Sequence, residues 1–170
     1  MKAIVHIGVE KTGTTAIQEC LDLNRDFLFK SNIGTSSVLG YKNNRNLAVY
    51  GMGNSNDDPY IKKLGVDNAK DRELWKKKLE RDFLNEVSTL EKEVNTVLIS
   101  SEHLQSRLKK KEEVSRVKVF LKEYFDEIKI IVYLRRQDEA AISLYSTLLR
   151  VGRYRKQIFN PNISETDQLF

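Results

Sequence analysis

Short runs of apolar residues mark the places where strands are expected. Such runs occur at Lys2 to Ile7, at Val97 to Ile99 and at Ile128 to Leu134, and the last run is rich in β-branched side chains. Their length and composition are typical of buried strands. A further short strand is indicated at Val38 to Tyr41. From Lys42 to Pro59 the chain is rich in Asn, Gly and Asp, which predicts a long loop and a candidate lid or acceptor-binding element.

Apolar residues at helical spacing fill most of the intervals between these strands. Helices are predicted from Thr14 onward, over residues 71–94, over residues 112–125 and after Gln137. Strands that alternate with amphipathic helices predict the α/β class, with a mostly parallel central sheet flanked by helices. A length of 170 residues favours one domain over residues 1–170.

The first predicted strand leads directly into the loop Gly8-Val9-Glu10-Lys11-Thr12-Gly13-Thr14-Thr15. Glycines let backbone N–H groups approach an anion, and the following helix N-terminus adds unpaired donors and partial positive charge. In nucleoside-triphosphate loops a lysine directly follows the second glycine, but here Thr14 stands at that place and Lys11 lies in mid-loop. The loop therefore predicts a phosphate site for an anion that needs no metal. The alternative is an ordinary Gly/Thr turn that caps a helix.

The segment from His6 to Thr15 resembles the 5′-phosphosulfate loop of sulfotransferases that use 3′-phosphoadenosine 5′-phosphosulfate (PAPS), which commonly reads P-K-[ST]-G-[TS]-[TS]. Glu10 stands where many members of that family have proline. The resemblance implies that Lys11 stabilises charge on the bridging oxygen as the sulfuryl group leaves. It also implies that the 5′ phosphate is held by Thr12, Gly13, Thr14 and Thr15.

A second segment fits the same resemblance. The apolar run at Ile128 to Leu134 ends in Arg135-Arg136, and Ser143 lies eight residues after Arg135 on a predicted helix. In the sulfotransferase family an arginine and a serine at this spacing bind the 3′ phosphate, which implies that role for Arg135 and Ser143. A guanidinium group offers a planar fork of donors to phosphate oxygens. For Arg136, an ion pair with Asp138 or Glu139 on a solvated face is an equally good interpretation.

A third polar cluster, Glu102 and His103, follows the apolar run that begins at Val97. Sulfuryl transfer to an alcohol needs a base for the acceptor proton, and both residue types can serve. The family often places a histidine at such a strand end, which favours His103, whereas Glu102 would orient it or pair with Lys11. Because neighbours on a strand point to opposite faces, only one of the two is expected to face the sulfate. A structural, partly buried histidine is the alternative.

Composition gives no indication of a nucleic-acid-binding protein, a disulfide framework, a metal site or a membrane span. The net charge is +5 and the isoelectric point about 9.2, but the 29 basic and 24 acidic residues are interspersed, which suits an anionic ligand without requiring nucleic acid. The single cysteine, Cys20, excludes an internal disulfide and is expected in the core, on the apolar face of the first helix. Two histidines and one cysteine form no recurrent metal-ligand spacing. No run of about 18 apolar residues indicates a membrane span, so a cytoplasmic protein is expected.

The resemblance covers the chain from Met1 to about Gly152 and implies an enzyme that moves a sulfuryl group from PAPS to a hydroxyl acceptor without a metal, leaving adenosine 3′,5′-bisphosphate (PAP). The acceptor class is open between carbohydrate, lipid and small molecule. Beyond Gly152, either the chain is a truncated or minimal member, or its closing element lies in Arg153-Tyr154-Arg155-Lys156. The alternatives are a P-loop kinase-like phosphotransferase and a non-catalytic nucleotide-binding module.

Overall fold

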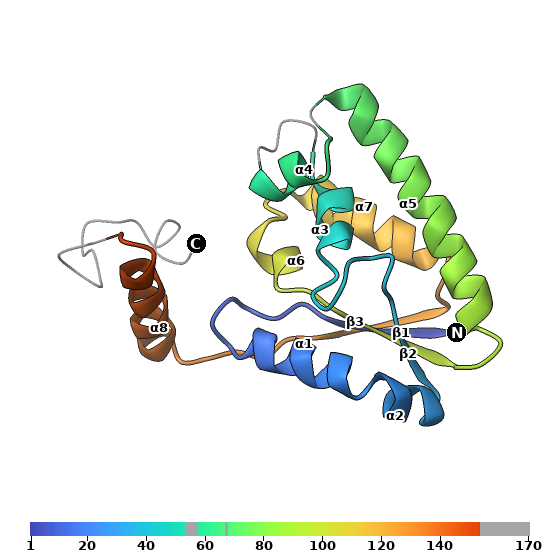
Figure 1. The fold of residues 1–170 in the computed structure, drawn as a ribbon, viewed down its shortest axis with the longest axis horizontal. Helices are drawn as coiled ribbons and strands as arrows, with labels where there is room; N and C mark the ends of the chain where they lie inside the picture. Colours follow the sequence, from blue (N-terminus) through green and yellow to red (C-terminus); the bar gives the residue numbers. More distant parts are fainter. Residues whose placement is uncertain (54–57, 67, 154–170) are drawn as a thin grey trace.

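The computed structural model describes residues 1–53, 58–66 and 68–153. Within these residues the core of the molecule is a four-stranded parallel sheet in the order β2-β3-β1-β4 (Figure 1). The strands are β1 (Lys2–His6), β2 (Ile33–Thr35), β3 (Thr96–Ser100) and β4 (Glu127–Ile131). The predicted α/β class with a parallel central sheet is therefore confirmed.

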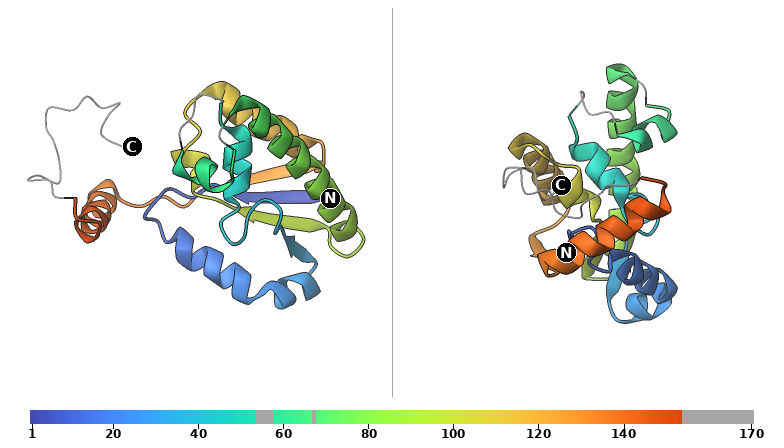
Figure 2. Two further views of the ribbon diagram at one scale, coloured as in Figure 1. Left: turned by 45° about the horizontal axis from the view of Figure 1, so that its top comes forward. Right: turned by 90° about the vertical axis from the view of Figure 1, so that its left-hand side faces the viewer.

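Helices cover both faces of the sheet, as Figures 1 and 2 show. One face carries α1 (Thr14–Leu23) and α2 (Arg25–Lys30); the other carries α3 (Arg45–Gly51), α4 (Pro59–Lys63), α5 (Ala69–Leu90), α6 (His103–Ser106) and α7 (Lys111–Lys122). The last described helix, α8 (Gln137–Arg150), extends away from the sheet. Helices α5 and α7 agree to within about one turn with the two predicted over residues 71–94 and 112–125.

Strand register places three connections at one edge of the sheet. His6, the last residue of β1, is level with Ser100 of β3 and with Ile131 of β4. Because all three strands are parallel, the segments that follow them leave at the same edge, where ligands bind in open α/β sheets. The polar clusters predicted after each strand are thus brought together by the register.

The main core lies between the sheet and the layer of α3, α5 and α7. Phe83 of α5 is fully buried and stacks on Phe120 of α7, with ring centroids 5.3 Å apart, while Tyr124 meets Phe83 edge-on at 4.9 Å. From the sheet, the alternate residues of β1 and β3 complete this core: Ala3, Val5, Val97 and Ile99. Burial of this apolar surface fixes the sheet on which the edge is built.

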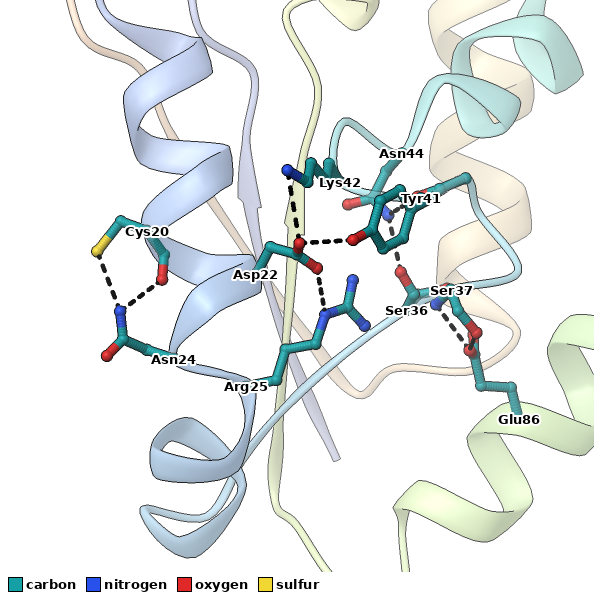
Figure 3. A network of polar contacts seen from close by, with 11 residues as sticks. Cys20, Asp22, Asn24, Arg25, Ser36, Ser37, Tyr41, Lys42, Asn44 and Glu86 are labelled. Carbon is teal, nitrogen blue, oxygen red and sulfur yellow. Dashed lines mark hydrogen bonds and ion pairs between the residues drawn. The ribbon is translucent and has the colours of Figure 1, made fainter.

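Two expectations for residues 38–59 are wrong. The second strand lies earlier, at Ile33–Thr35, and the predicted loop contains α3, which is buried against the core. Asn44, one of the residues that indicated a loop, instead closes the turn before α3: its side-chain amide donates to the carbonyls of Ser36 and Gly40 at 3.0 and 2.9 Å (Figure 3). The Asn-rich segment that predicts a long loop thus forms a tight turn that leads into a helix. Residues 54–57 lie outside the described part of the chain.

A polar network fixes the C-terminal half of α1 against the same turn (Figure 3). Asp22 accepts hydrogen bonds from the Tyr41 hydroxyl at 2.7 Å and from Arg25 at 2.8 Å, and it lies 3.6 Å from the Lys42 ammonium. The hydrogen bond from Tyr41, with the two cations, lowers the pKa of Asp22. The network holds α1 in position from the end opposite to the β1–α1 loop.

Two predicted burials are also wrong. Most of the run at Ile128 to Leu134 is exposed, because β4 is an edge strand and the chain leaves the sheet after Ile131. Cys20 is exposed as well. Helix α1 turns Thr14 and Gln18 inward instead of Cys20, so its inner face is partly polar. In the described part of the chain, no helix is both long and apolar enough to span a bilayer.

Candidate functional site

The loop between β1 and α1 is a tight turn that leaves the start of the helix open. Lys11 and Gly13 have left-handed backbone conformations, with φ of 69° and 88°. The amide and the hydroxyl of Thr12 both donate to the Val9 carbonyl, at 3.3 and 2.6 Å. The turn delivers the chain to Thr14, where α1 begins, and the first N–H groups of a helix have no acceptor inside it. Such a helix start is suited to bind an anion.

A pocket of about 370 Å³ opens at this helix start. It is lined by side chains and backbone from the segments that follow β1, β3 and β4: Glu10, Lys11, Gly13, Thr14, Thr15, Glu102, Arg135 and Ser143. The volume lies within the usual range for small-molecule sites. All three segments predicted from the sequence to carry chemistry therefore contribute to one pocket.

The two basic residues of the pocket are connected through the loop backbone and α8. The Arg135 guanidinium donates to the Lys11 carbonyl at 3.1 Å and pairs with Glu139 at 3.1 Å, while the Lys11 ammonium donates to the Thr147 hydroxyl at 2.7 Å. Arg136 instead pairs with Asp138 at 2.8 Å, and its side chain is 77 % exposed. Arg135 therefore lines the pocket, whereas Arg136 forms an ion pair with Asp138 on a solvated face, one of the two interpretations that the sequence offered for it.

Glu102 and His103 occupy different environments. Strand β3 ends at Ser100, so the expected strand alternation does not extend to these residues, and His103 begins the short helix α6. The Glu102 carboxylate lines the pocket. His103 is buried behind it, with Nε2 3.6 Å from Glu102 and 3.4 Å from the amide of Asn43. Burial lowers the pKa of His103, and the adjacent Glu102 opposes this only in part.

Two residues of the site were not predicted. Gln18 is buried and donates from its amide to Glu102 Oε2 at 2.6 Å. It lies four residues after Thr14 on α1, so helical spacing alone places it on the inner face and could have identified it. Glu10, which lines the pocket, lies 3.7 Å from Arg107 of the α6–α7 connection; that partner is distant in sequence, and no local pattern indicates it.

Thr12, which by the resemblance would hold phosphate, donates its hydroxyl to the Val9 carbonyl in this structure and so closes the turn. Among the described residues, no group of three His, Cys, Asp or Glu side chains is arranged to hold a metal ion. Of the suggested closing element, Arg153 ends the described range, and residues 154–156 lie outside it.

Comparisons of this chain with models of known protein families, with curated proteins and with solved structures gave no match.

Proposed function

We propose that this chain binds PAPS and transfers its sulfuryl group to a hydroxyl acceptor. The supporting observation is the convergence on one pocket of Lys11 and the start of α1 with Arg135 and Ser143. By resemblance to PAPS-dependent sulfotransferases, the first group would bind the 5′ phosphosulfate of the nucleotide and the second group its 3′ phosphate. A single phosphate-binding loop is common to many nucleotide proteins, whereas a second basic segment in the same pocket suits a nucleotide phosphorylated at two positions.

In this proposal the 5′ phosphosulfate occupies the start of α1. The unpaired N–H groups and the hydroxyls of Thr14 and Thr15 bind its oxygens, and the helix dipole favours their charge. The 3′ phosphate lies against Arg135 and Ser143, where a guanidinium and a hydroxyl donate to it. Arg135 keeps its hydrogen bond to the Lys11 carbonyl, which links the two phosphate subsites directly.

The transfer breaks the bond between sulfur and the bridging oxygen and forms one between sulfur and the acceptor oxygen. The electron pair of the broken bond remains on the 5′ phosphate, giving PAP. Lys11 exchanges its hydrogen bond to Thr147 for one to the bridging oxygen, where charge develops in the transition state. The acceptor proton passes to a protein base.

We assign the base to Glu102 in place of His103. The Glu102 carboxylate lines the pocket, whereas His103 is 8 % exposed and lies behind it. A general base must come within hydrogen-bond reach of the acceptor proton, and geometry takes precedence over intrinsic pKa. Gln18 and His103 hold the carboxylate from either side and would orient it.

The assignment of the 3′-phosphate subsite is tested with the twin arginines. Arg135→Ala should weaken PAP binding by about 1.5–3 kcal/mol, the range for hydrogen bonds to charged groups. Arg136→Ala is the matched control, since it removes the same charge from the neighbouring position but from a solvated ion pair. Isothermal titration calorimetry of both variants decides the assignment. Equal losses of affinity would mean that only net charge matters and that Arg135 is not a phosphate ligand.

A second candidate function is a magnesium-dependent phosphotransferase. It is favoured by the two carboxylates, Glu10 and Glu102, that line the pocket beside the Thr15 hydroxyl, since Mg²⁺ in phosphoryl-transfer sites prefers such oxygen ligands. That enzyme would bind ATP only with Mg²⁺, whereas the sulfotransferase would bind PAP in the absence of Mg²⁺.

A nucleotide-binding module without activity would bind PAP but fail to transfer the sulfuryl group of PAPS to any hydroxyl acceptor.

A further inference from the structure

One buried side chain, His6, contacts all three segments that build the pocket. It is the last residue of β1 and is 4 % exposed. Its Nδ1 lies 2.9 Å from the hydroxyl of Ser100, which ends β3 two residues before Glu102. Its ring meets the Tyr133 ring edge-on at 5.4 Å, and Tyr133 lies two residues before Arg135.

The same imidazole lies directly beneath the phosphate loop. A Cβ atom built on Gly8 would clash with the methyl group of Thr14 and would lie 3.0 Å from His6 Cε1 and 3.1 Å from Nε2. Gly8 is therefore needed so that the loop can pack against the ring and the first residue of α1. Gly8, the first residue of the loop, thus lets His6 contact the loop closely.

A histidine at this position costs more folding free energy than an aliphatic residue that only fills the core. Its Nε2 is buried and, among the described residues, has no hydrogen-bond partner. An unpaired buried polar atom costs about 1–3 kcal/mol, which an aliphatic side chain would avoid. Burial also lowers the pKa of His6, so the ring is neutral at neutral pH and does not act as a cationic phosphate ligand.

We propose that His6 is a positioning residue that couples the two phosphate subsites, by holding the Lys11 loop and the Arg135 segment in the arrangement that one nucleotide can bridge. This inference rests on the proposed function, because the coupling is defined by a ligand with phosphates at both ends. His6 touches no ligand atom; it acts through Gly8 and Thr14 on one side and through Tyr133 on the other.

The coupling is measured as the ratio of the Kd of adenosine 5′-phosphate to the Kd of PAP, which reports the gain in affinity from the 3′ phosphate. In His6→Ala this ratio should fall by about tenfold, equivalent to about 1.4 kcal/mol. General destabilisation lowers Tm and weakens both ligands alike, so it leaves the ratio unchanged. His6→Asn keeps an amide near the Nδ1 position and should retain more of the ratio than His6→Ala.

Two neighbouring serines supply the matched control. Ser100 and Ser101 are both buried, but only the Ser100 hydroxyl bonds to the His6 ring. Ser101 bonds to His6 through its backbone N–H, which donates to the His6 carbonyl at 2.9 Å and is kept in Ser101→Ala, while the Ser101 hydroxyl has no partner within the described chain. Ser100→Ala should lower the ratio, and Ser101→Ala should leave it within about twofold of wild type, about 0.4 kcal/mol. These variants and His6→Asn carry the test if His6→Ala does not fold.

Two outcomes overturn different statements. A wild-type protein that binds PAP, with the same ratio in every His6 and Ser100 variant, would refute the coupling and leave the proposed function intact. A wild-type protein that binds adenosine 5′-phosphate as tightly as PAP has no 3′-phosphate subsite. That result would remove the proposed function, and the coupling with it.

Discussion

At the scale of single residues, Glu102 and His103 show how little separates a residue that lines the pocket from one that supports it. They are adjacent in sequence, yet the carboxylate reaches the pocket and the imidazole is buried behind it. The difference arises because β3 ends at Ser100 and the chain turns into α6, which the sequence pattern did not indicate.

This difference predicts unequal effects on turnover. With an acceptor that supports sulfuryl transfer from PAPS, Glu102→Gln should lower kcat by about 10²-fold or more, because the amide cannot take the acceptor proton. The Kd of PAP should change little. His103→Gln should have a smaller effect on kcat, since that residue acts only through Glu102. Steady-state kinetics at saturating PAPS make the comparison; a larger loss of kcat in His103→Gln would return the role of base to the histidine.

The residues of the loop could be predicted because the signal is local. Gly8, Lys11, Gly13 and Thr14 lie in one contiguous motif whose backbone chemistry is specific. The contacts of Glu10 with Arg107 and of His6 with Tyr133 join residues about 100 or more positions apart. Such pairs depend on the strand register, which one sequence does not specify.

At the scale of elements, α8 is the least supported part of the site. None of its residues is buried, and it extends from the sheet as Figure 1 shows. Contacts to the loop region are provided by Thr147, which accepts a hydrogen bond from Lys11, and by Arg135, which lies two residues before the helix. A ligand that binds both Ser143 and the loop would therefore strongly stabilise the contact between α8 and the loop.

Hydrogen exchange measured by mass spectrometry tests this expectation. Adding PAP at about 100 times its Kd should slow amide exchange in α8 by up to about 100-fold, the linkage limit for a ligand that binds only the docked helix. Helix α2 is the control, since it also has no buried residue but lies away from the pocket. If PAP slowed exchange equally in α2 and α8, or in neither helix, the ligand would not be bound between the loop and α8.

The elements themselves were predictable to different degrees. Helices α5 and α7 have clear apolar faces, and their existence and approximate bounds follow from spacing alone. Helix α3 could not be predicted in this way, because it is short and follows an Asn-rich segment that is typical of a loop. Burial of the run after Ile128 was wrong because an apolar run does not reveal whether a strand lies at the edge of a sheet.

At the scale of the whole molecule, the two buried histidines make stability depend on pH. Burial lowers the pKa of both His6 and His103, which Glu102 opposes in each case. Below the unfolded pKa of about 6.5, the unfolded chain binds more protons than the folded one, so the free energy of unfolding decreases as the pH is lowered from about 6.5 to the folded pKa. Above about pH 6.5, neither histidine changes the free energy of unfolding.

Urea unfolding between pH 7.5 and pH 5 measures the effect. The free energy of unfolding should be level down to about pH 6.5 and then fall by up to about 1.4 kcal/mol per pH unit for each histidine. Asp58 and Glu113, whose pKa values are also lowered, add to the loss only below about pH 4.5. His103→Gln should reduce the slope between pH 6.5 and pH 5. A flat curve over that range in the wild-type protein would show that the histidines are not protected from protonation.

Under the proposed function, the pocket between the loop and α8 binds a nucleotide that carries phosphates at its 3′ and 5′ positions, and it needs no metal to do so. Isothermal titration calorimetry in the presence of EDTA tests it most directly, with PAP as the ligand and ATP with excess Mg²⁺ as the comparison in a second buffer. We expect saturable binding of PAP in EDTA and binding of Mg²⁺-ATP that is at least about 100-fold weaker, a difference of about 2.7 kcal/mol. Equal or tighter binding of Mg²⁺-ATP, with no binding of PAP in EDTA, would contradict the claim and favour the phosphotransferase.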